Sequence, residues 1–306
     1  KLIDKIRKDL ALTKGWDCTL DDGAFTELDN GKKLVLTTDS FIVTPLFFPG
    51  GDIGTLAFCG TVNDLAVMGA DPLGLTCALV IEEGFEDLEK IIESMNNLSQ
   101  QEAIPIVTGD TKVMEKGNLD KIIVNTAGVG LANTILRDDS LKPGDKLLVT
   151  GTIGDHQAAL LAKRFDIETE LKSDCMPLVK TMKEVRDLCK AAKDPTRGGL
   201  VSTLNELASK SKVGIEINEK DVPFRRESKS ICDLLGLDPF HLASEGRALI
   251  ACEASKADEV LQKLQKFNRD AAIIGTANEE NRVTLKTQFG KRIIEPYTGK
   301  PIPRIC

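Results

Sequence analysis

Residues 50–71 read GGDIGTLAFCGTVNDLAVMGAD, and nearly all side chains in the middle of this run are apolar. The run begins with glycines, has the length of a helix and ends at an Asp-Pro pair, so it predicts a helix with an almost entirely nonpolar surface. Asp64 is the charged side chain in its interior. Because an unpaired buried carboxylate is very costly, the fold must bury this helix and still give Asp64 a partner.

Segments typical of strands and of helices alternate through the first half of the chain. Apolar, β-rich runs predict strands at 31–43, 73–82, 104–111 and 121–132. The run 86–101 predicts a helix, because Leu88, Ile91, Ile92, Met95 and Leu98 recur at helical spacing and form a stripe that faces the core.

A polar segment, RDDSLKPGD at 137–145, separates this half from a second one. The pattern then restarts with a strand, a glycine loop and a helix over 146–165. Further helices are expected at 177–192, 199–210, 228–236 and 256–267, and strands at 213–218, 247–253, 271–277 and 282–287. The sequence thus predicts a mixed α/β (α+β) fold with domains at 1–140 and 141–294 and an extended tail at 295–306.

Charge and composition narrow the class of protein. The net charge of −7 argues against binding to nucleic acid, which needs a dense basic face. No apolar run approaches the roughly 18 residues that cross a membrane, and the charged N-terminus KLIDKIRKDL is not a signal peptide. Eight cysteines without a CxxC pair indicate a reducing cytoplasm.

Acidic residues follow apolar runs at several places in the first half. Asp39 follows LVLTT, Asp110 follows IPIVTG, and Asp21 and Asp22 stand in TLDDGAF. Together with Asp64 and its neighbour Asn63, these side chains offer the oxygen ligands that Mg²⁺ prefers beside substrate phosphates. Each aspartate alone is equally well explained as the cap of a turn or a helix, although the position of Asp64 within a helix is not a cap.

Other candidates are weaker when each is taken alone. Lys112, two residues after Asp110, is either a surface lysine or a cation beside a phosphate site, and the chain has no P-loop motif. In the second half, residues 194–199 place glycines ahead of a helix, which suits an anion or merely a turn. His241, Glu245 and Arg247 form either an acid–base group or a salt bridge in a loop.

The chain ends in EPYTGKPIPRIC, with a cysteine at its last position. Prolines 296, 301 and 303 favour an extended arm that reaches tens of ångströms, at about 3.1 Å per residue. The thiol of Cys306 either has a function at the tip of this arm or stands there by accident.

Taken in order, these motifs resemble the HypE family of hydrogenase maturation factors, carbamoyl dehydratases of the AIR-synthetase-like (PurM-like) superfamily. The resemblance covers essentially the whole chain and rests on DDGA (21–24), residues 37–73, VTGDTKVMEKG (107–117), DPTRGGL (194–200), HLASEGR (241–247) and PRIC (303–306). The aspartate blocks are shared across the superfamily, whereas PLFFPGGDIG and the terminal PRIC single out HypE. The family usually has a short glycine-containing segment ahead of the first helix. The first residues of this chain correspond to positions within that helix.

The resemblance implies a reaction and assigns roles. Cys306 would receive a carbamoyl group, and ATP would be used to convert this S-carboxamide into a thiocyanate. Mg²⁺ would be held by Asp22, Asp39, Asp64 and Asp110, which would also bind ATP together with Asn63 and Thr111. Glu245 would act as the base and Lys112 would stabilise the transferring phosphoryl group, while His241, Arg247 and residues 194–199 are weaker candidates.

The resemblance also implies partners. The carbamoyl group would come from the transferase HypF, the cyano group would pass to an iron held by a HypC–HypD complex, and the chain would form a homodimer through strands of its first domain. Two other functions stay open: an enzyme of the cyclo-ligase or selenophosphate synthetase type acting on a free small molecule, and a non-catalytic scaffold with a docking tail. Deleting Cys306 would spare the first, and Asp64→Asn would spare the second.

Overall fold

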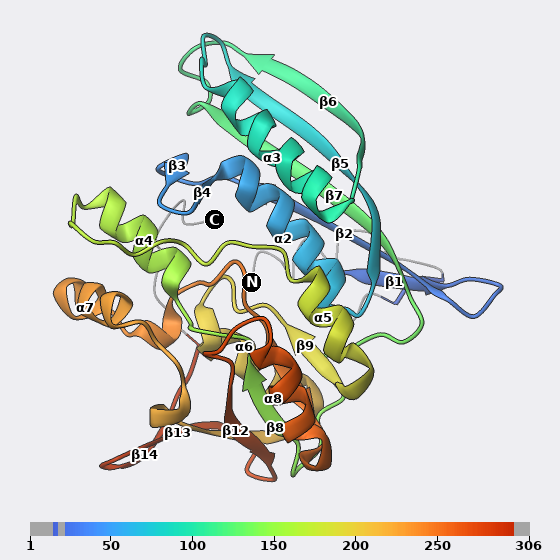
Figure 1. Ribbon diagram of the computed structural model, residues 1–306, viewed down its shortest axis with the longest axis vertical. Coiled ribbons are helices and arrows are strands. Elements are labelled where there is room, and N and C mark those ends of the chain that lie inside the picture. Colours follow the sequence, from blue (N-terminus) through green and yellow to red (C-terminus); the bar gives the residue numbers. More distant parts are fainter. Residues whose placement is uncertain (1–14, 18–21, 297–306) are drawn as a thin grey trace.

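The computed structural model describes residues 15–17 and 22–296. Its first sheet has five strands in the order β1-β2-β7-β5-β6. The strands are β1 (Ala24–Glu27), β2 (Lys33–Phe41), β5 (Asp71–Glu82), β6 (Ile106–Met114) and β7 (Ile122–Ala132). β5 and β6 run parallel, and the other neighbours are antiparallel. Helices α2 (Ile53–Val67) and α3 (Leu88–Glu102) cover one face, and β3 (Phe47–Phe48) pairs with β4 (Gly51–Asp52) just before α2 (Figure 1).

The second sheet has seven strands in the order β14-β13-β10-β12-β8-β11-β9. They are β8 (Lys146–Val149), β9 (Ala191–Lys193), β10 (Gly214–Asn218), β11 (Leu249–Cys252), β12 (Ala272–Asn278), β13 (Val283–Thr287) and β14 (Gly290–Ile293). The helices of this half are α4 (Asp155–Arg164), α5 (Val179–Val185), α6 (Gly199–Ser211), α7 (Arg226–Leu235) and α8 (Ala257–Gln265). Short 3₁₀ turns lie at Arg186–Leu188, Glu219–Asp221, Pro239–His241 and Ala254–Lys256.

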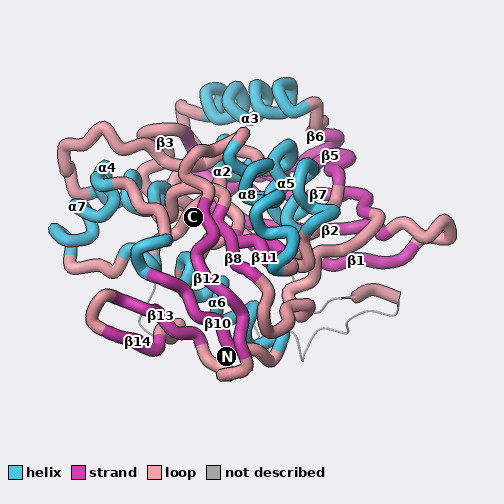
Figure 2. Tube along the Cα trace, turned by 60° about the horizontal axis from the view of Figure 1, so that its bottom comes forward, coloured by secondary structure: helices cyan, strands magenta, loops and turns pink. Residues whose placement is uncertain are grey.

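Side-chain alternation on the strands produces a layered arrangement. On β8, Leu147 and Val149 pack with residues of α6, whereas Leu148 points the other way and packs with α5 and α8. The layer of α5 and α8 also contacts the end of α2, so these three helices lie between the two sheets (Figures 1 and 2).

Helix α2 lies at the centre of the molecule. All its residues except Thr55 and Asp64 are buried, as expected for a helix that is apolar on all sides. The Asp52 carboxylate accepts a hydrogen bond from the Thr55 amide at 2.8 Å and caps its first turn. The predicted central apolar helix is therefore confirmed.

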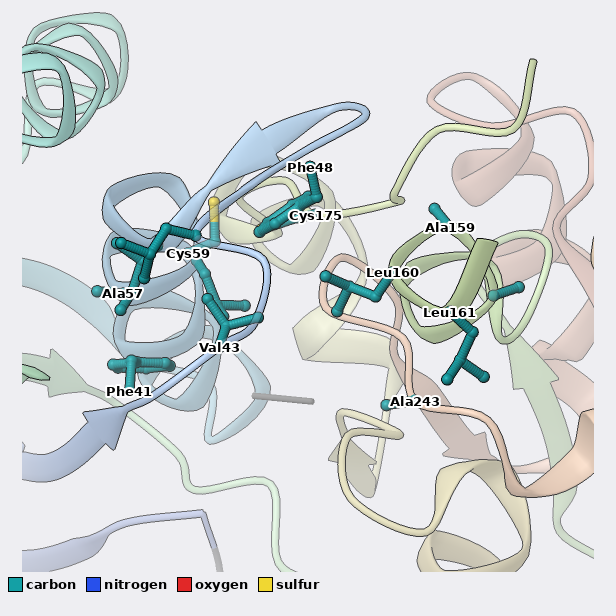
Figure 3. Close-up of a cluster of buried hydrophobic side chains, with 14 of the residues drawn as sticks. Phe41, Val43, Phe48, Ala57, Cys59, Ala159, Leu160, Leu161, Cys175 and Ala243 are labelled. Carbon is teal, nitrogen blue, oxygen red and sulfur yellow. The ribbon is translucent and has the colours of Figure 1, made fainter. Parts of the chain in front are cut away.

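A hydrophobic cluster joins the two halves of the chain beside α2. Phe41, Val43, Ala57 and Cys59 lie on one side, Leu160 and Leu161 of α4 lie on the other, and Phe48 and Cys175 lie between them (Figure 3). The segment that carries Cys175 comes from the second half and crosses over the first. This crossing brings residues of both halves to one site.

The predicted mixed α/β (α+β) class is confirmed, and the predicted strands and helices correspond to those observed, with two corrections. The helix expected at 177–192 ends at Val185, and Ala191–Lys193 form a strand on β11. Alanines favour helices locally, but pairing with a neighbouring strand decides here. Ile92 is 47% exposed, so it lies beside the buried stripe of Ile91 and Met95 and not within it.

β1 and β14 were not expected from the sequence. The predicted tail 295–306 lies outside the described residues beyond Pro296. Among the helices in the described part of the chain, none has the length and apolar character needed to span a membrane. The domain boundaries stay a prediction.

Candidate active site

A cavity of about 240 Å³ lies where the two halves meet. The first half contributes Asp22, Thr37, Thr38, Asp39, Ser40, Phe41, Gly60 and Asp64, and the second half contributes Asp194, Thr196, Arg197 and Glu245. Five carboxylates and several hydroxyls therefore surround one space. We call this cavity the acidic pocket.

Three of the carboxylates form a compact group within the acidic pocket. Oxygen atoms of Asp22, Asp64 and Asp194 all lie within 4.8 Å of one another. Asp22 precedes β1, Asp64 lies on α2, and Asp194 directly follows β9. Oxygen donors at such spacing from three separate elements suit a hard divalent cation.

Alternation along β2 directs side chains to the acidic pocket. Thr37, Asp39 and Phe41 share the face that points toward α2, because successive residues of a strand point to opposite sides. The Thr37 hydroxyl lies 2.6 Å from Asp64 Oδ2 and 2.9 Å from the main-chain oxygen of Asp22. Thr37 thus links two of the carboxylate-bearing segments.

Burial and mutual repulsion make these carboxylates reluctant to ionise. Burial raises the pKa of Asp64 well above its usual value, and the charges of Asp194, Asp22 and Asp39 raise it further. Burial likewise raises the pKa of Asp194 to about 6. Burial also raises the pKa of Asp39, against the opposing effect of Arg197. A bound cation would relieve this repulsion.

Lys193 supplies the positive charge nearest to the group. Its ammonium is paired with Asp22 and lies 3.4 Å from Asp138 and 3.6 Å from Glu206. Burial alone would lower the pKa of Lys193, but Asp22 and Asp138 raise it above its usual value, so the amine stays charged. Burial raises the pKa of Asp22, and Lys193 partly offsets this rise.

Glu245 lines the acidic pocket, which is the position expected of a residue that acts beside phosphates. It is only 2% exposed and stands in the irregular segment between the turn Pro239–His241 and β11. Arg197, from the DPTRGGL motif, is exposed and lines the same cavity. The acidic pocket therefore combines three carboxylates at a spacing that suits a cation, a candidate base and an arginine.

Asn63 points elsewhere. Its amide nitrogen donates to the main-chain oxygens of Met176 at 3.1 Å and Glu245 at 3.0 Å, and its oxygen accepts from the Leu178 amide at 2.7 Å. These bonds use both donors and one acceptor position of a side chain that is 1% exposed. Asn63 does not line the acidic pocket, in contrast to the role expected from the sequence.

Asp110, Thr111 and Lys112 also lie apart from the acidic pocket of their own chain. They are exposed on β6, the edge strand, where Asp110 pairs with Lys112 at 2.8 Å. The hydrogen bond from Lys112 lowers the pKa of Asp110. Across the sheet, Asp39 pairs with Thr126 on β7, Thr126 pairs with Cys77 on β5, and Cys77 pairs with Gly109 on β6. Three strand spacings, about 14 Å, therefore separate Asp39 from β6.

The weaker candidates divide between the acidic pocket and its surroundings. Asp194, Thr196 and Arg197 line the cavity, whereas His241 and Arg247 do not. Arg247 is buried and donates to the main-chain oxygens of Thr152 at 3.0 Å and Gly246 at 2.7 Å. Asp21 and Cys306 lie outside the described residues.

Sequence reasoning missed Thr37 and Lys193 as members of the site. The available signal for Lys193 was the stretch AAKDP, in which the lysine stands between two alanines and an Asp-Pro pair. It pointed to a buried cation, but its partner Asp22 is 171 residues away in the chain.

Comparisons with known proteins give the architecture a family context. The model of the N-terminal domain of AIR synthase related proteins matches residues 20–132, and the model of the C-terminal domain matches 142–288. The chain is 43% identical over 294 residues to the carbamoyl dehydratase HypE of Rhizobium leguminosarum bv. viciae, a match that covers 90% of this chain and 83% of that protein.

Solved structures are similar over nearly the whole length. The crystal structure of a HypE–HypF complex contains a chain that matches with a TM-score of 0.91 at 41% identity, over 97% of this chain and 99% of that one. The crystal structure of the hydrogenase maturation protein HypE in complex with ATP matches with a TM-score of 0.87 at 34% identity, over 100% of this chain and 97% of that one. The AIR-synthetase-like fold predicted from the sequence is thereby confirmed.

Proposed function

Because this chain belongs to the AIR synthase related family and, within it, to the carbamoyl dehydratases named HypE, we propose that it dehydrates a carbamoyl group carried on the thiol of its own Cys306. The product would be a thiocyanate, the source of a cyanide ligand for nickel–iron hydrogenase. One observation carries the proposal: Glu245 and the three clustered aspartates line the same cavity.

The chemistry needs both of these features. A carboxamide oxygen is a poor leaving group, so the γ-phosphoryl group of ATP is transferred to it and makes it a phosphate ester. The two protons on nitrogen are removed, the C–O bond breaks and phosphate departs. A carbon–nitrogen triple bond then remains on the sulfur. Glu245 is the proposed base for the nitrogen, because it is a buried carboxylate of the cavity that does not belong to the cluster of Asp22, Asp64 and Asp194.

The donors of the acidic pocket fit Mg²⁺. Asp22, Asp64 and Asp194 are all oxygen donors, their pKa values are raised in the absence of a cation, and their spacing suits one ion. Asp39 adds a further carboxylate at the wall of the cavity. When bound, the ion would neutralise charge on the phosphates during phosphoryl transfer. Arg197, which also lines the cavity, would contact the phosphates.

A homodimer offers a role for the residues of β6. The face of the first sheet opposite α2 carries half-exposed apolar side chains, and alternation places Asp110 and Lys112 on this same face. We propose that two chains associate through it. Asp110 and Lys112 would then approach phosphates in the acidic pocket of the partner subunit, where a lysine stabilises transferring charge. Thr111 lies between them with its side chain on the other face, so it would contribute through its main chain.

The proposed reaction also defines partners. A relative of this chain has been crystallised with HypF, and we propose HypF as the donor of the carbamoyl group and a HypC–HypD complex as the acceptor of the cyano group. The division into domains 1–140 and 141–294 with a tail at 295–306 would let one thiol visit each partner and the acidic pocket. Cytoplasmic thiol chemistry suits this work, because the carrier cysteine must stay reduced.

The intact mass of the protein tests this proposal. The native chain is incubated with purified HypF, carbamoyl phosphate and MgATP, and Cys306→Ala and Asp64→Asn are treated in parallel. We expect the native chain to gain a carbamoyl group and then lose one water, and Cys306→Ala to gain nothing. Asp64→Asn should gain the carbamoyl group and lose water at least 100-fold more slowly, since it weakens the site for Mg²⁺ and phosphate.

Asp71→Asn serves as the control, because Asp71 is half-exposed and pairs with Arg186 outside the acidic pocket. It should behave as the native chain does. An unmodified native chain, under conditions in which HypF is active on another acceptor, would refute the proposed function.

A further inference from the structure

The main chain of Glu245 is held by side chains and not by secondary structure. Its amide donates to Asp174 Oδ1 at 2.9 Å, and its carbonyl oxygen accepts from Asn63 Nδ2 at 3.0 Å. Asn63 comes from α2 in the first half, and Asp174 comes from the crossing segment ahead of α5. Two distant parts of the chain thus fix one residue from both sides.

Asn63 and Asp174, which bind the main chain of Glu245, are themselves buried and held by further contacts. Asn63 is 1% exposed and Asp174 is 6% exposed. The Asn63 amide also binds the main chain of Met176 and Leu178, two and four residues after Asp174. A side chain at Gly246 would come within 2.0 Å of the Asp174 main-chain oxygen, so the two segments are in direct backbone contact.

The contacts of Asp174 point to a role beyond packing. Its Oδ1 accepts from the Glu245 amide, while its buried Oδ2 makes no hydrogen bond of normal geometry among the described residues, although the Ser244 hydroxyl and the charge of Arg247 both act on the carboxylate. Burying a carboxylate with one oxygen unsatisfied is costly when a neutral side chain would fill the same space. Such a cost is expected where a group supports a functional residue.

We propose that Asn63 and Asp174 are positioning residues for the dehydration step, which hold the backbone of Glu245 so that its carboxylate stays in the acidic pocket. This inference rests on the proposed role of Glu245 as the base. Asn63 is adjacent in sequence to Asp64. The same turn of α2 therefore carries Asp64, a proposed Mg²⁺ ligand, and Asn63, which holds the main chain of Glu245. A displacement of the base by about 1 Å is enough to slow such a reaction about 100-fold.

The test is single-turnover loss of water from the carbamoylated protein, followed by intact mass, for the native chain, Asp174→Ala and Asp174→Asn. We expect Asp174→Ala to load with carbamoyl normally, to bind ATP within about threefold of the native affinity and to lose water about 100-fold more slowly. Asp174→Asn should recover most of this loss, because an amide oxygen accepts the same hydrogen bond from Glu245.

Asp145→Ala is the matched control. Asp145 is also a buried aspartate that accepts from a main-chain amide, at Lys142, and from a lysine, but it does not contact Glu245. This variant should be less stable than the native chain and still lose water within about threefold of the native rate. The comparison separates positioning from a general loss of stability.

Asn63→Asp gives an independent variant if Asp174→Ala does not fold. It keeps the shape of the side chain and the acceptor for Leu178, but it has no N–H group to donate to Glu245, so a loss of about 100-fold is again expected. A native rate in Asp174→Ala or Asn63→Asp, equal rates in the two Asp174 variants, or an equal loss in Asp145→Ala would overturn the inference. A native chain that loads but never loses water would instead refute the function on which it rests.

Discussion

Lys193 determines the charge balance of the acidic pocket. Lys193 is 8% exposed, and its ammonium offsets one of the three clustered carboxylates through the ion pair with Asp22. Asp64 and Asp194 make no such ion pair among the described residues. Burial and the neighbouring carboxylates raise the pKa of Asp64, and burial raises the pKa of Asp194 against the opposing charge of Lys193. The ion-free site is therefore incompletely neutralised, which favours entry of a divalent cation.

The ionisation of Asp174 makes the stability of the fold depend on pH. Burial raises the pKa of Asp174 to about 6 in the folded protein, above the usual value of 3.8. The folded state thus holds this proton more tightly than the unfolded state, and stability is lost as the pH rises from about 4 through 6. Asp174→Asn removes the ionisation and keeps the acceptor, so it should stabilise the protein at pH 7.5 by on the order of 2–3 kcal/mol relative to pH 4.5.

Urea denaturation of both proteins at the two pH values measures this difference. The unfolding free energy of the variant should exceed that of the native chain by this much more at pH 7.5 than at pH 4.5. A difference that is the same at both pH values would mean that Asp174 does not titrate between them.

Helix α2 shows how one element connects fold and site. It is buried on nearly all sides, it carries Asp64 toward the acidic pocket and Asn63 toward the crossing segment, and its first turn packs closely on α3. A Cβ at Gly54 would lie 2.5 Å from the main-chain oxygen of Ile91 and 2.7 Å from Ser94 Oγ. The close approach of α2 and α3 therefore requires glycine at this position.

Gly54→Ala tests this packing at the scale of the element. Alanine favours a helix by about 1 kcal/mol over glycine, but overpacking costs about 1–3 kcal/mol. Because the nearest atom belongs to the backbone of α3, we expect the clash to prevail and the free energy of unfolding to fall by about 1–2 kcal/mol. Urea denaturation measures it, with Asn96→Ala on the exposed side of α3 as a control that should stay within about 0.5 kcal/mol. A Gly54→Ala protein more stable than the native chain would show that the helices can separate without cost.

At the scale of the whole molecule, the first sheet has one covered face and one open face. Along β7, buried residues alternate with half-buried ones, and the half-buried set includes Ile123, Ala127, Val129 and Leu131. Leu36 on β2 lies opposite Val129 and is 44% exposed. An antiparallel sheet that faces water is normally polar on that side, so this open apolar face suits association with a second chain.

Leu36→Lys should therefore shift the protein toward monomers. A charge within the proposed apolar interface is costly, and we expect the dissociation constant of the proposed dimer to rise at least 10-fold, measured by analytical ultracentrifugation. Phe289→Lys is the control, since Phe289 is 91% exposed next to β14 and away from the first sheet. If both variants associate as the native chain does, the open face of the first sheet is not the dimer interface.

Short-range patterns in the sequence were enough to predict most elements and several of their functional residues. The stripe in 86–101 predicted α3, the apolar run predicted α2, and the lone charge within that run identified Asp64. These features are readable because periodicity and propensity act over a few neighbouring residues. Where pairing with a distant strand overrode propensity, as at β9, the pattern predicted a helix instead.

Which of the candidate residues meet depends on the folded chain. It brought Asp194 to Asp22 and Asp64, supplied Lys193 as their counter-charge, turned Asn63 toward Glu245, and left Asp110 and Lys112 on an open edge. The physical reason is that these contacts join residues far apart in the chain, such as Asp22 and Lys193. Their geometry follows from the strand register and from the packing of the two halves around α2, which no local stretch of sequence contains.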